Sequence, residues 1–242
     1  MANEEFGQII SRIQAGFRRT LRNGVLLADP NMRELQRRLL SMEPKRLSQK
    51  SLMDTRFVVI DTETTGLRAY GGDEICSIAL LEIEGLKITN RSLSTLINPG
   101  RTIPAESTRL HNITDDAVKD APVIEEVLLD IAEFIGESVI VGHHIGFDIR
   151  FLNKILQREL LCHLKHPWLD TMLLYLAMTG RTGQHSLDRV AEYTRIKIRN
   201  RHTAYGDAMA TAELFLKLTA HLAGTKDPVY RLISRQHEIS RV

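Results

Sequence analysis

The sequence has few cysteines and no long apolar run, and these absences exclude several classes of protein. Its 242 residues include two cysteines, Cys76 and Cys162, which lack the spacing of a zinc site or of a disulfide framework. We expect both in the core. No stretch approaches the roughly 18 apolar residues of a membrane helix, and the first residues lack the apolar centre of a signal peptide. We therefore predict a cytoplasmic protein without a membrane partner.

Net charge is also low, at +2, but its distribution is uneven. Residues 1–56 carry 11 Lys/Arg against 6 Asp/Glu, whereas the remainder carries 21 against 24. Lysine and arginine neutralise phosphates, and clustered carboxylates hold cations. A basic appendage on an acidic domain fits a nucleic-acid partner, although ordinary solvated surface charge explains the same numbers equally well.

The N-terminal part is predicted to be helical. An apolar stripe at helical period from Phe6 to Phe17 ends at Asn23-Gly24. A second helix begins near Asp29, where Asn31 and Glu34 resemble a capping box, and presents Leu35, Leu39 and Leu40 on one side. Polar residues 44–50 are typical of a linker. We therefore divide the chain into a basic helical extension with linker, 1–54, and a second domain, 55–242.

From Phe57 onward the pattern alternates between strands and helices, which is typical of an α/β domain. We predict consecutive strands at 57–60, 75–83 and 93–97, and a buried strand at 138–141. Helices are predicted at 123–135, after Phe147, and at 186–193, 203–222 and the last dozen residues. With 43% hydrophobic residues and no internal repeat, one sizeable core is the simplest interpretation.

Two carboxylates follow the first apolar strand. Asp61 and Glu63 lie two residues apart, so their side chains leave the same face of the backbone. Ionised carboxylates at the end of a buried strand are costly unless they are paired or bind a cation, and no Lys or Arg follows before Arg68. The pair therefore predicts a metal site.

Three further residues are ambiguous one by one. Asp148 falls in the first turn of a helix, where the helix dipole favours an acidic residue without any function. Asp207 lies in the helix that starts after Thr203, and His202 precedes Asp207 by five residues. That offset separates side chains by about 140° on a helix, so the two share a site only if His202 lies before it. Thr203 as N-cap permits this.

In their order and spacing, these residues match one known pattern. The sequence resembles the DEDDh family of 3′-to-5′ exonucleases, in its DnaQ-like group, to which the proofreading epsilon subunit of bacterial DNA polymerase III and the PolC exonuclease domain belong. The resemblance extends from about Arg56 to Leu222 and rests on Phe57–Leu67, Val141–Asp148 and His202–Ala208. The family's tyrosine branch would require Tyr at the position of Thr203, so the histidine branch is favoured. Asn112, where glycine is usual, and His144, where asparagine is common, depart from the pattern.

The resemblance implies a ribonuclease H-like fold, a mixed central sheet flanked by helices, here with an N-terminal helical extension. It also implies two divalent ions, Mg²⁺ or Mn²⁺, with Asp61 bridging them, Glu63 and Asp207 completing the first and Asp148 binding the second. His202 would be the general base toward the attacking water. The terminal nucleotide would be contacted by Thr64, Thr65, Gly66, Leu67, Glu106, His111, His143 and Phe147.

The predicted activity is release of nucleoside 5′-monophosphates from single-stranded or frayed 3′ ends of DNA, in proofreading or repair. An RNA 3′-to-5′ exonuclease of the same superfamily is one alternative, and a noncatalytic nucleic-acid-binding module is another. For the N-terminal helices, packing against the catalytic domain competes with docking to a polymerase partner.

Overall fold

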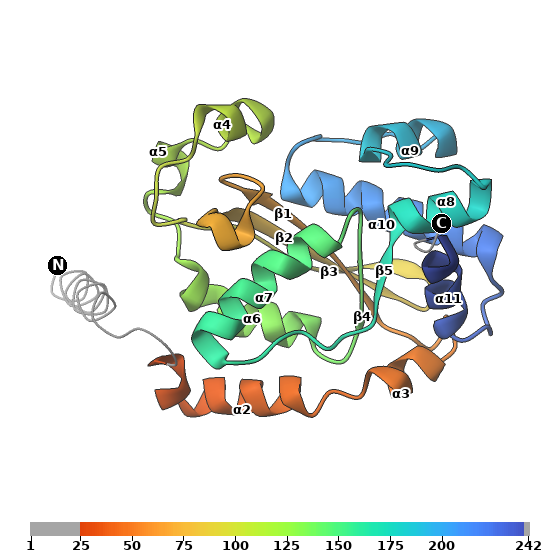
Figure 1. Ribbon diagram of the computed structural model, residues 1–242, viewed down its shortest axis with the longest axis horizontal. Helices are drawn as coiled ribbons and strands as arrows, with labels where there is room; N and C mark the ends of the chain where they lie inside the picture. The colour runs from red at the N-terminus through yellow and green to blue at the C-terminus, as the bar shows by residue number, and fades with distance from the viewer. Residues whose placement is uncertain (1–24, 240–242) are drawn as a thin grey trace, which may run out of the picture.

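The computed structural model describes residues 25–239 as a five-stranded mixed sheet between two layers of helices (Figure 1). The strand order is β3-β2-β1-β4-β5. β2 is antiparallel to both β1 and β3, whereas β4 is parallel to β1 and β5 to β4. The strands are β1 (Phe57–Thr64), β2 (Ile75–Glu84), β3 (Lys87–Leu96), β4 (Val139–Gly142) and β5 (Trp168–Asp170). The predicted fold class is confirmed. The helix predicted from Phe6 to Phe17 lies outside the described residues.

The alternation of side chains along β1 divides the core between the two helical layers. Val58 and Ile60 pack with α2 (Pro30–Leu40), α6 (Ile124–Ile135) and α7 (Gly146–Leu160). Phe57 and Val59 pack with the opposite layer, where the Phe57 and Phe215 rings lie 4.8 Å apart. That layer consists of α8 (Thr171–Thr179), α9 (Leu187–Thr194), α10 (Ala204–Leu222) and α11 (Tyr230–Ile239).

Two short helices, α4 (Ala105–His111) and α5 (Asp115–Val118), lie above one side of the sheet in Figure 1, and α9 lies above the other side. Two short 3₁₀ turns, η1 (Val25–Ala28) and η2 (Ala69–Gly71), complete the described elements. The end of β1 that carries Asp61 and Glu63 is directed toward the same part of the molecule as α4 and α9 (Figure 1). Elements far apart in sequence therefore surround these carboxylates.

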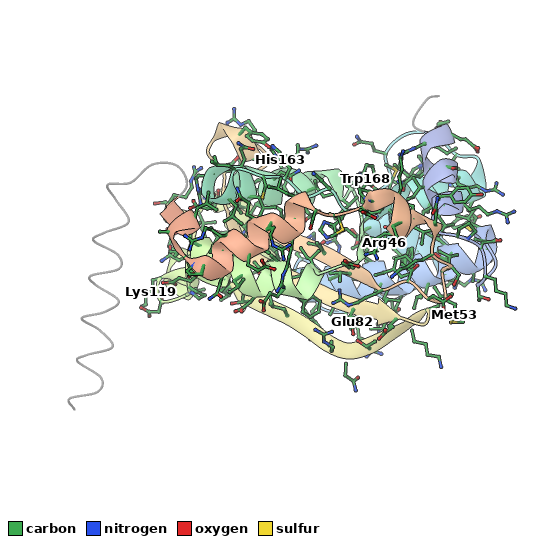
Figure 2. The ribbon with its side chains drawn as sticks, turned by 90° about the horizontal axis from the view of Figure 1, so that it is seen from below. Arg46, Met53, Glu82, Lys119, His163 and Trp168 are labelled. Atoms are coloured by element: carbon green, nitrogen blue, oxygen red, sulfur yellow. The ribbon has the colours of Figure 1, made fainter. Side chains whose placement is uncertain are left out.

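The described part of the N-terminal extension packs against the domain. Met32, Leu35 and Leu39 of α2 are buried, and α2 contacts α6 and α7. Leu40, predicted on the same apolar side, is instead 48% exposed, because it lies about 100° around α2 from the buried Leu39. Figure 2 views this side, with α2 and α3 in front and Arg46 labelled.

Two details of that extension were predicted wrongly. The cap of α2 is Asp29, whose Oδ1 accepts a hydrogen bond from the Asn31 amide at 2.8 Å, so Asn31 is inside the helix. The predicted linker at 44–50 contains the helix α3 (Pro44–Gln49), because Pro44 suits the first helical position and Leu47 is buried. Its polar residues are the helix's solvent face.

The strands are longer than their apolar runs predicted. β1 continues through Asp61 and Glu63 to Thr64, because β2 pairs with it along that whole length. β3 begins at Lys87 rather than at Leu93, since an edge strand with an exposed face has polar residues there. The sequence reasoning did not predict β5 or α8. Both cysteines are buried and free, as expected. None of the described helices is long and apolar enough to cross a membrane.

Candidate active site

The site begins where β1 extends beyond its parallel neighbour. β4 pairs with β1 only from Phe57 to Val59, whereas β2 pairs with it up to Thr64. Alternation places Asp61 and Glu63 on the face of β1 toward α10, and Thr62 on the face toward α7. The predicted convergence of the first two carboxylates therefore occurs within a strand rather than after it.

Asp207 joins this pair from α10. Oxygen atoms of Asp61, Glu63 and Asp207 all lie within 4.8 Å of one another, the one such group of three potential metal ligands among residues 25–239. Asp207 occupies the first turn of α10, behind the N-cap Thr203, whose Oγ1 accepts a hydrogen bond from the Gly206 amide at 3.1 Å. The predicted N-cap is confirmed, and it brings a late helix to the first strand.

Asp148 approaches from the other face. It lies in the first turn of α7, as predicted, and is buried. Its Oδ1 accepts a hydrogen bond of 2.7 Å from the Thr62 hydroxyl. Asp148 is outside the group of three, yet its charge is close enough to raise the pKa of Asp61. The fourth carboxylate thus flanks the cluster across β1.

His202 lies in the loop before α10, so the angular objection for a continuous helix does not apply. Its backbone has a positive φ of 63°, and it lies close enough to Asp207 to offset part of the rise that burial causes in the pKa of that carboxyl. The loop passes close to α10 because residue 206 is glycine: a Cβ there would lie 2.2 Å from the Asn200 carbonyl oxygen. Gly206 therefore permits the backbone approach that puts His202 beside the cluster.

Arg201 is a site residue that the sequence reasoning missed. Its Nη1 donates to Asp207 Oδ2, while Nε and Nη2 donate to the Asp188 carboxylate, each at 2.9 Å to its nearer oxygen. Arg201 is far from Asp61 in the sequence, so no local pattern around Asp61 indicates it. The signal in the sequence is the position of Arg201 directly before His202.

The positive charge of Arg201 does not compensate for the negative charges of the four carboxylates, whose pKa values stay raised. Burial is the first cause that raises the pKa of Glu63 to about 7, with the charge of Asp207 next, and burial raises the pKa of Asp148 to about 7. Burial followed by the charge of Asp148 raises the pKa of Asp61 well above its ordinary value. Asp207 Oδ1 is buried without a hydrogen-bond partner among the described residues. This crowded, all-oxygen donor set fits a divalent cation.

These shifts predict an unusual dependence of stability on pH. A carboxyl whose pKa is raised in the folded state takes up a proton on folding, so these carboxyls should add stability to the metal-free protein as pH falls from 8 toward 5. The lowered pKa values of the buried His143 and His166 act in the opposite direction, but they affect the metal-free and the Mg²⁺-bound protein alike. The gain is at most about 1.4 kcal/mol per pH unit for each proton taken up. Melting temperatures measured with chelator and with saturating Mg²⁺ across this range check the prediction. The stabilisation by Mg²⁺ should shrink as pH falls, and a pH-independent difference between the two series would contradict it.

A cavity of about 690 Å³ adjoins the cluster at Glu63. Leu67 and Leu110 lie at this cavity and are 79% and 54% exposed. The Ser107 hydroxyl donates to the Thr65 carbonyl at 3.0 Å and ties α4 to the loop after β1. Seven of the eight predicted nucleotide contacts line the cavity: Thr64, Thr65, Gly66, Leu67, Glu106, His111 and Phe147.

His143, the eighth predicted contact, has a different environment. Its Nδ1 lies 2.9 Å from the Thr171 hydroxyl, and its Nε2 lies 2.9 Å from the His185 carbonyl. Both ring nitrogens therefore link the end of β4 to α8 and to the segment before α9. Contact of His143 with a substrate stays a prediction.

The two departures from the family pattern share a backbone conformation. Asn112 has φ 58° at the end of α4, and His144 has φ 57° after β4. Glycine and asparagine are the residues that adopt this left-handed region most readily. Asn112 therefore preserves the turn that glycine makes elsewhere, whereas the backbone of His144 is held by its amide, which donates to Asp170 Oδ1 at 3.1 Å.

Comparisons with known proteins agree with this geometry. Residues 58–215 match a family model described as "Exonuclease" (RNase T). The chain is 44% identical over 177 residues to a DNA polymerase III subunit epsilon-like protein of Rhodobacter capsulatus, covering 71% of this chain but only 25% of that protein. It is 35% identical over 184 residues to the DNA polymerase III subunit epsilon of Aquifex aeolicus, covering 76% and 90%. The structure of exonuclease X in complex with 5′ overhanging duplex DNA is similar, with a TM-score of 0.58, 25% identity, and coverage of 73% and 99%.

Proposed function

The chain belongs to the exonuclease family, and on this premise we propose that it is a metal-dependent 3′-to-5′ exonuclease that removes nucleotides from 3′ ends of DNA. The observation that carries the proposal is the convergence of Asp61, Glu63 and Asp207 beside a cavity with two exposed leucines. Exposed leucines at a cavity rim are suited to covering a nucleobase. The carboxylates would then lie beside the phosphodiester next to that base.

The proposed ligand sets follow from the faces of β1. Asp61, Glu63 and Asp207 would hold one divalent ion, and Asp148 with Asp61 would hold a second. Hard oxygen donors favour Mg²⁺ or Mn²⁺. When bound, such ions stabilise the negative charge that develops on the phosphate and on the departing 3′ oxygen.

The remaining steps are assigned to side chains of this chain. His202, in its loop at the cluster's edge, would accept the proton of the attacking water, as histidine commonly does. The cavity residues would bind and orient the terminal nucleotide, with Leu67 and Leu110 against the base. Thr62 would hold the Asp148 carboxylate in place through its hydroxyl.

The proposed setting is proofreading of newly made DNA. It is supported by the similarity to epsilon-type proteins, one of which this chain matches over 90% of that relative's length. Association with a polymerase through the N-terminal extension belongs to the same proposal. The buried contacts of α2 with α6 and α7 show that this part of the extension also packs on the domain itself.

A panel of 5′-labelled substrates tests the function: single-stranded DNA, single-stranded RNA, a paired primer end and a mismatched one, each with Mg²⁺ or with chelator. We expect stepwise shortening of DNA from the 3′ end, faster at the mismatched end, and no reaction with chelator. Degradation of RNA alone would replace the DNA assignment by the RNA one. Protein that binds these strands but shortens none would favour a noncatalytic module.

A further inference from the structure

A run of cations separates α9 from α10. From Arg195 to Arg201 every second residue is basic, and Ile196 and Ile198 alternate with them. Both isoleucines pack against the core layer of α10, while Arg195, Lys197 and Arg199 are exposed. The Ile196 amide donates to the Ala191 carbonyl at 2.8 Å, which fixes the start of the run. The alternation therefore presents three cationic side chains to solvent on an anchored backbone.

These three cations have no carboxylate partner in the part of the chain that the structure describes. Within residues 25–239, Arg195, Lys197 and Arg199 form no ion pair, unlike Arg201, which is bound to Asp188 and Asp207. The run itself contains no acidic residue. Glu213 of α10 is the one acidic residue of the hollow beside the run. The segment thus keeps a net positive charge available for an external anion.

An exposed aromatic ring lies next to these charges. A hollow of about 340 Å³ is bordered by Lys197, Arg199 and Asn200 of the run and by Tyr205, Met209 and Glu213 of α10. The side chain of Tyr205 is 42% exposed. Cations that follow a backbone and an aromatic ring on which a base stacks are the usual components of single-strand binding surfaces.

The basic run ends at the catalytic cluster. Arg201, the last cation of the run, donates through Nη1 to Asp207 Oδ2, and Gly206, the residue before Asp207, lines the hollow. Without a side chain at residue 206, the carbonyls of Arg199 and Asn200 lie against α10, so the run is held next to the cluster. The cavity for the terminal nucleotide adjoins the cluster at Glu63 instead. The cavity and the basic run therefore adjoin the cluster at two different carboxylates, Glu63 and Asp207.

We propose that Lys197, Arg199 and Tyr205 form a second contact site for the substrate strand, binding the backbone phosphates and a base on the 5′ side of the scissile phosphodiester. This inference rests on the proposed function and extends it. A strand would cross the carboxylates from the cavity to the basic run, so a substrate of several nucleotides would use contacts that a dinucleotide does not reach. The chain would consequently prefer long strands to short ones.

Binding measurements test the charge contribution. We compare the unmodified protein with Lys197→Ala/Arg199→Ala, using fluorescence anisotropy of a labelled oligothymidylate of about 12 nucleotides in chelator at several salt concentrations. Each lost phosphate contact on a single strand lowers the slope of log affinity against log salt by about 0.7. The double variant should therefore lose about 1.4 of that slope. The charge-conserving Lys197→Arg/Arg199→Lys should keep it.

Lys45→Ala/Lys87→Ala is the matched control. Both residues are exposed and have no ion pair within the described chain, and they lie at the other end of the sheet, with α3 and the β2–β3 turn. The slope of log affinity against log salt for this control variant should equal that of the unmodified protein. Tyr205→Leu should weaken binding several-fold without changing the slope, because it removes stacking and no charge.

Activity separates this inference from the proposed function. The ratio of kcat/KM on the long strand to kcat/KM on a dinucleotide should fall about ten-fold in Lys197→Ala/Arg199→Ala. An unchanged salt slope, or equal losses on both substrates, would overturn the inference while leaving the exonuclease assignment intact. If the unmodified protein binds with the full salt slope but hydrolyses neither substrate, the exonuclease assignment is wrong, while the second contact site is still supported.

Discussion

Replacement of Asp61 by asparagine is expected to lower the exonuclease rate by about a thousand-fold or more. Burial and then the charges of Asp148, Asp207 and Glu63 raise the pKa of Asp61. Its carboxylate therefore lies close to the other three, and it is the proposed shared ligand of both ions. Metal ions supply several kcal/mol of transition-state stabilisation, and each 1.36 kcal/mol is a factor of ten in rate. The rate is measured on single-stranded DNA with saturating Mg²⁺.

The same substitution should stabilise the metal-free protein. Asparagine keeps the shape of aspartate and removes a buried charge that three neighbouring carboxylates repel. The melting temperature in chelator should therefore rise at pH 8, and the further stabilisation by Mg²⁺ should largely disappear. Asp130→Asn, an exposed position on α6, is the matched control and should change neither quantity. A variant that retains a tenth of the rate would remove Asp61 from the proposed metal site.

Replacement of His202 by glutamine is expected to lower kcat by about a hundred- to ten-thousand-fold, the usual contribution of a general base. Glutamine has hydrogen-bonding groups but cannot accept a proton at neutral pH. Because the carboxylates are untouched, the affinity for Mn²⁺, measured by calorimetry, should stay within about two-fold. This combination distinguishes a base from a metal ligand or a structural residue.

His221→Gln is the control for this substitution, since His221 lies in the last turn of α10, at the opposite end of that helix from His202, and is exposed. It should leave kcat unchanged. The base would have to be sought elsewhere if His202→Gln kept more than a tenth of the activity. If Mn²⁺ affinity fell together with kcat, the role of His202 would be to position the Asp207 carboxylate.

The order of strands and helices could be predicted from apolar periodicity, but the ends of several elements could not. β3 begins six residues before its apolar run, and residues 44–49 are helical although their composition is typical of a linker. In both cases the deciding contact comes from another part of the chain: β2 supplies hydrogen bonds to the polar half of β3, and the domain covers Leu47. Local sequence does not contain that information.

The candidate site divides in the same way. Asp61 and Glu63 could be assigned to one face from the two-residue period of a strand alone. The order and spacing of Asp148, His202 and Asp207 indicated a family, while any one of them alone was an ordinary residue at a helix start. Arg201 and the hollow at Tyr205 required the structure, because their importance depends on which segments lie beside α10.

The sequence by itself therefore determined that Asp61 and Glu63 share one face of the strand, that the N-cap Thr203 places His202 outside α10, and to which family the chain belongs. Each depends on backbone periodicity or on residue order, which are local properties. Only the tertiary structure decided that Asp148 reaches the cluster from the opposite face of β1, through Thr62, and that a basic run lies against Gly206. Those arrangements depend on how strands and helices distant in sequence pack together, and no local pattern encodes that packing.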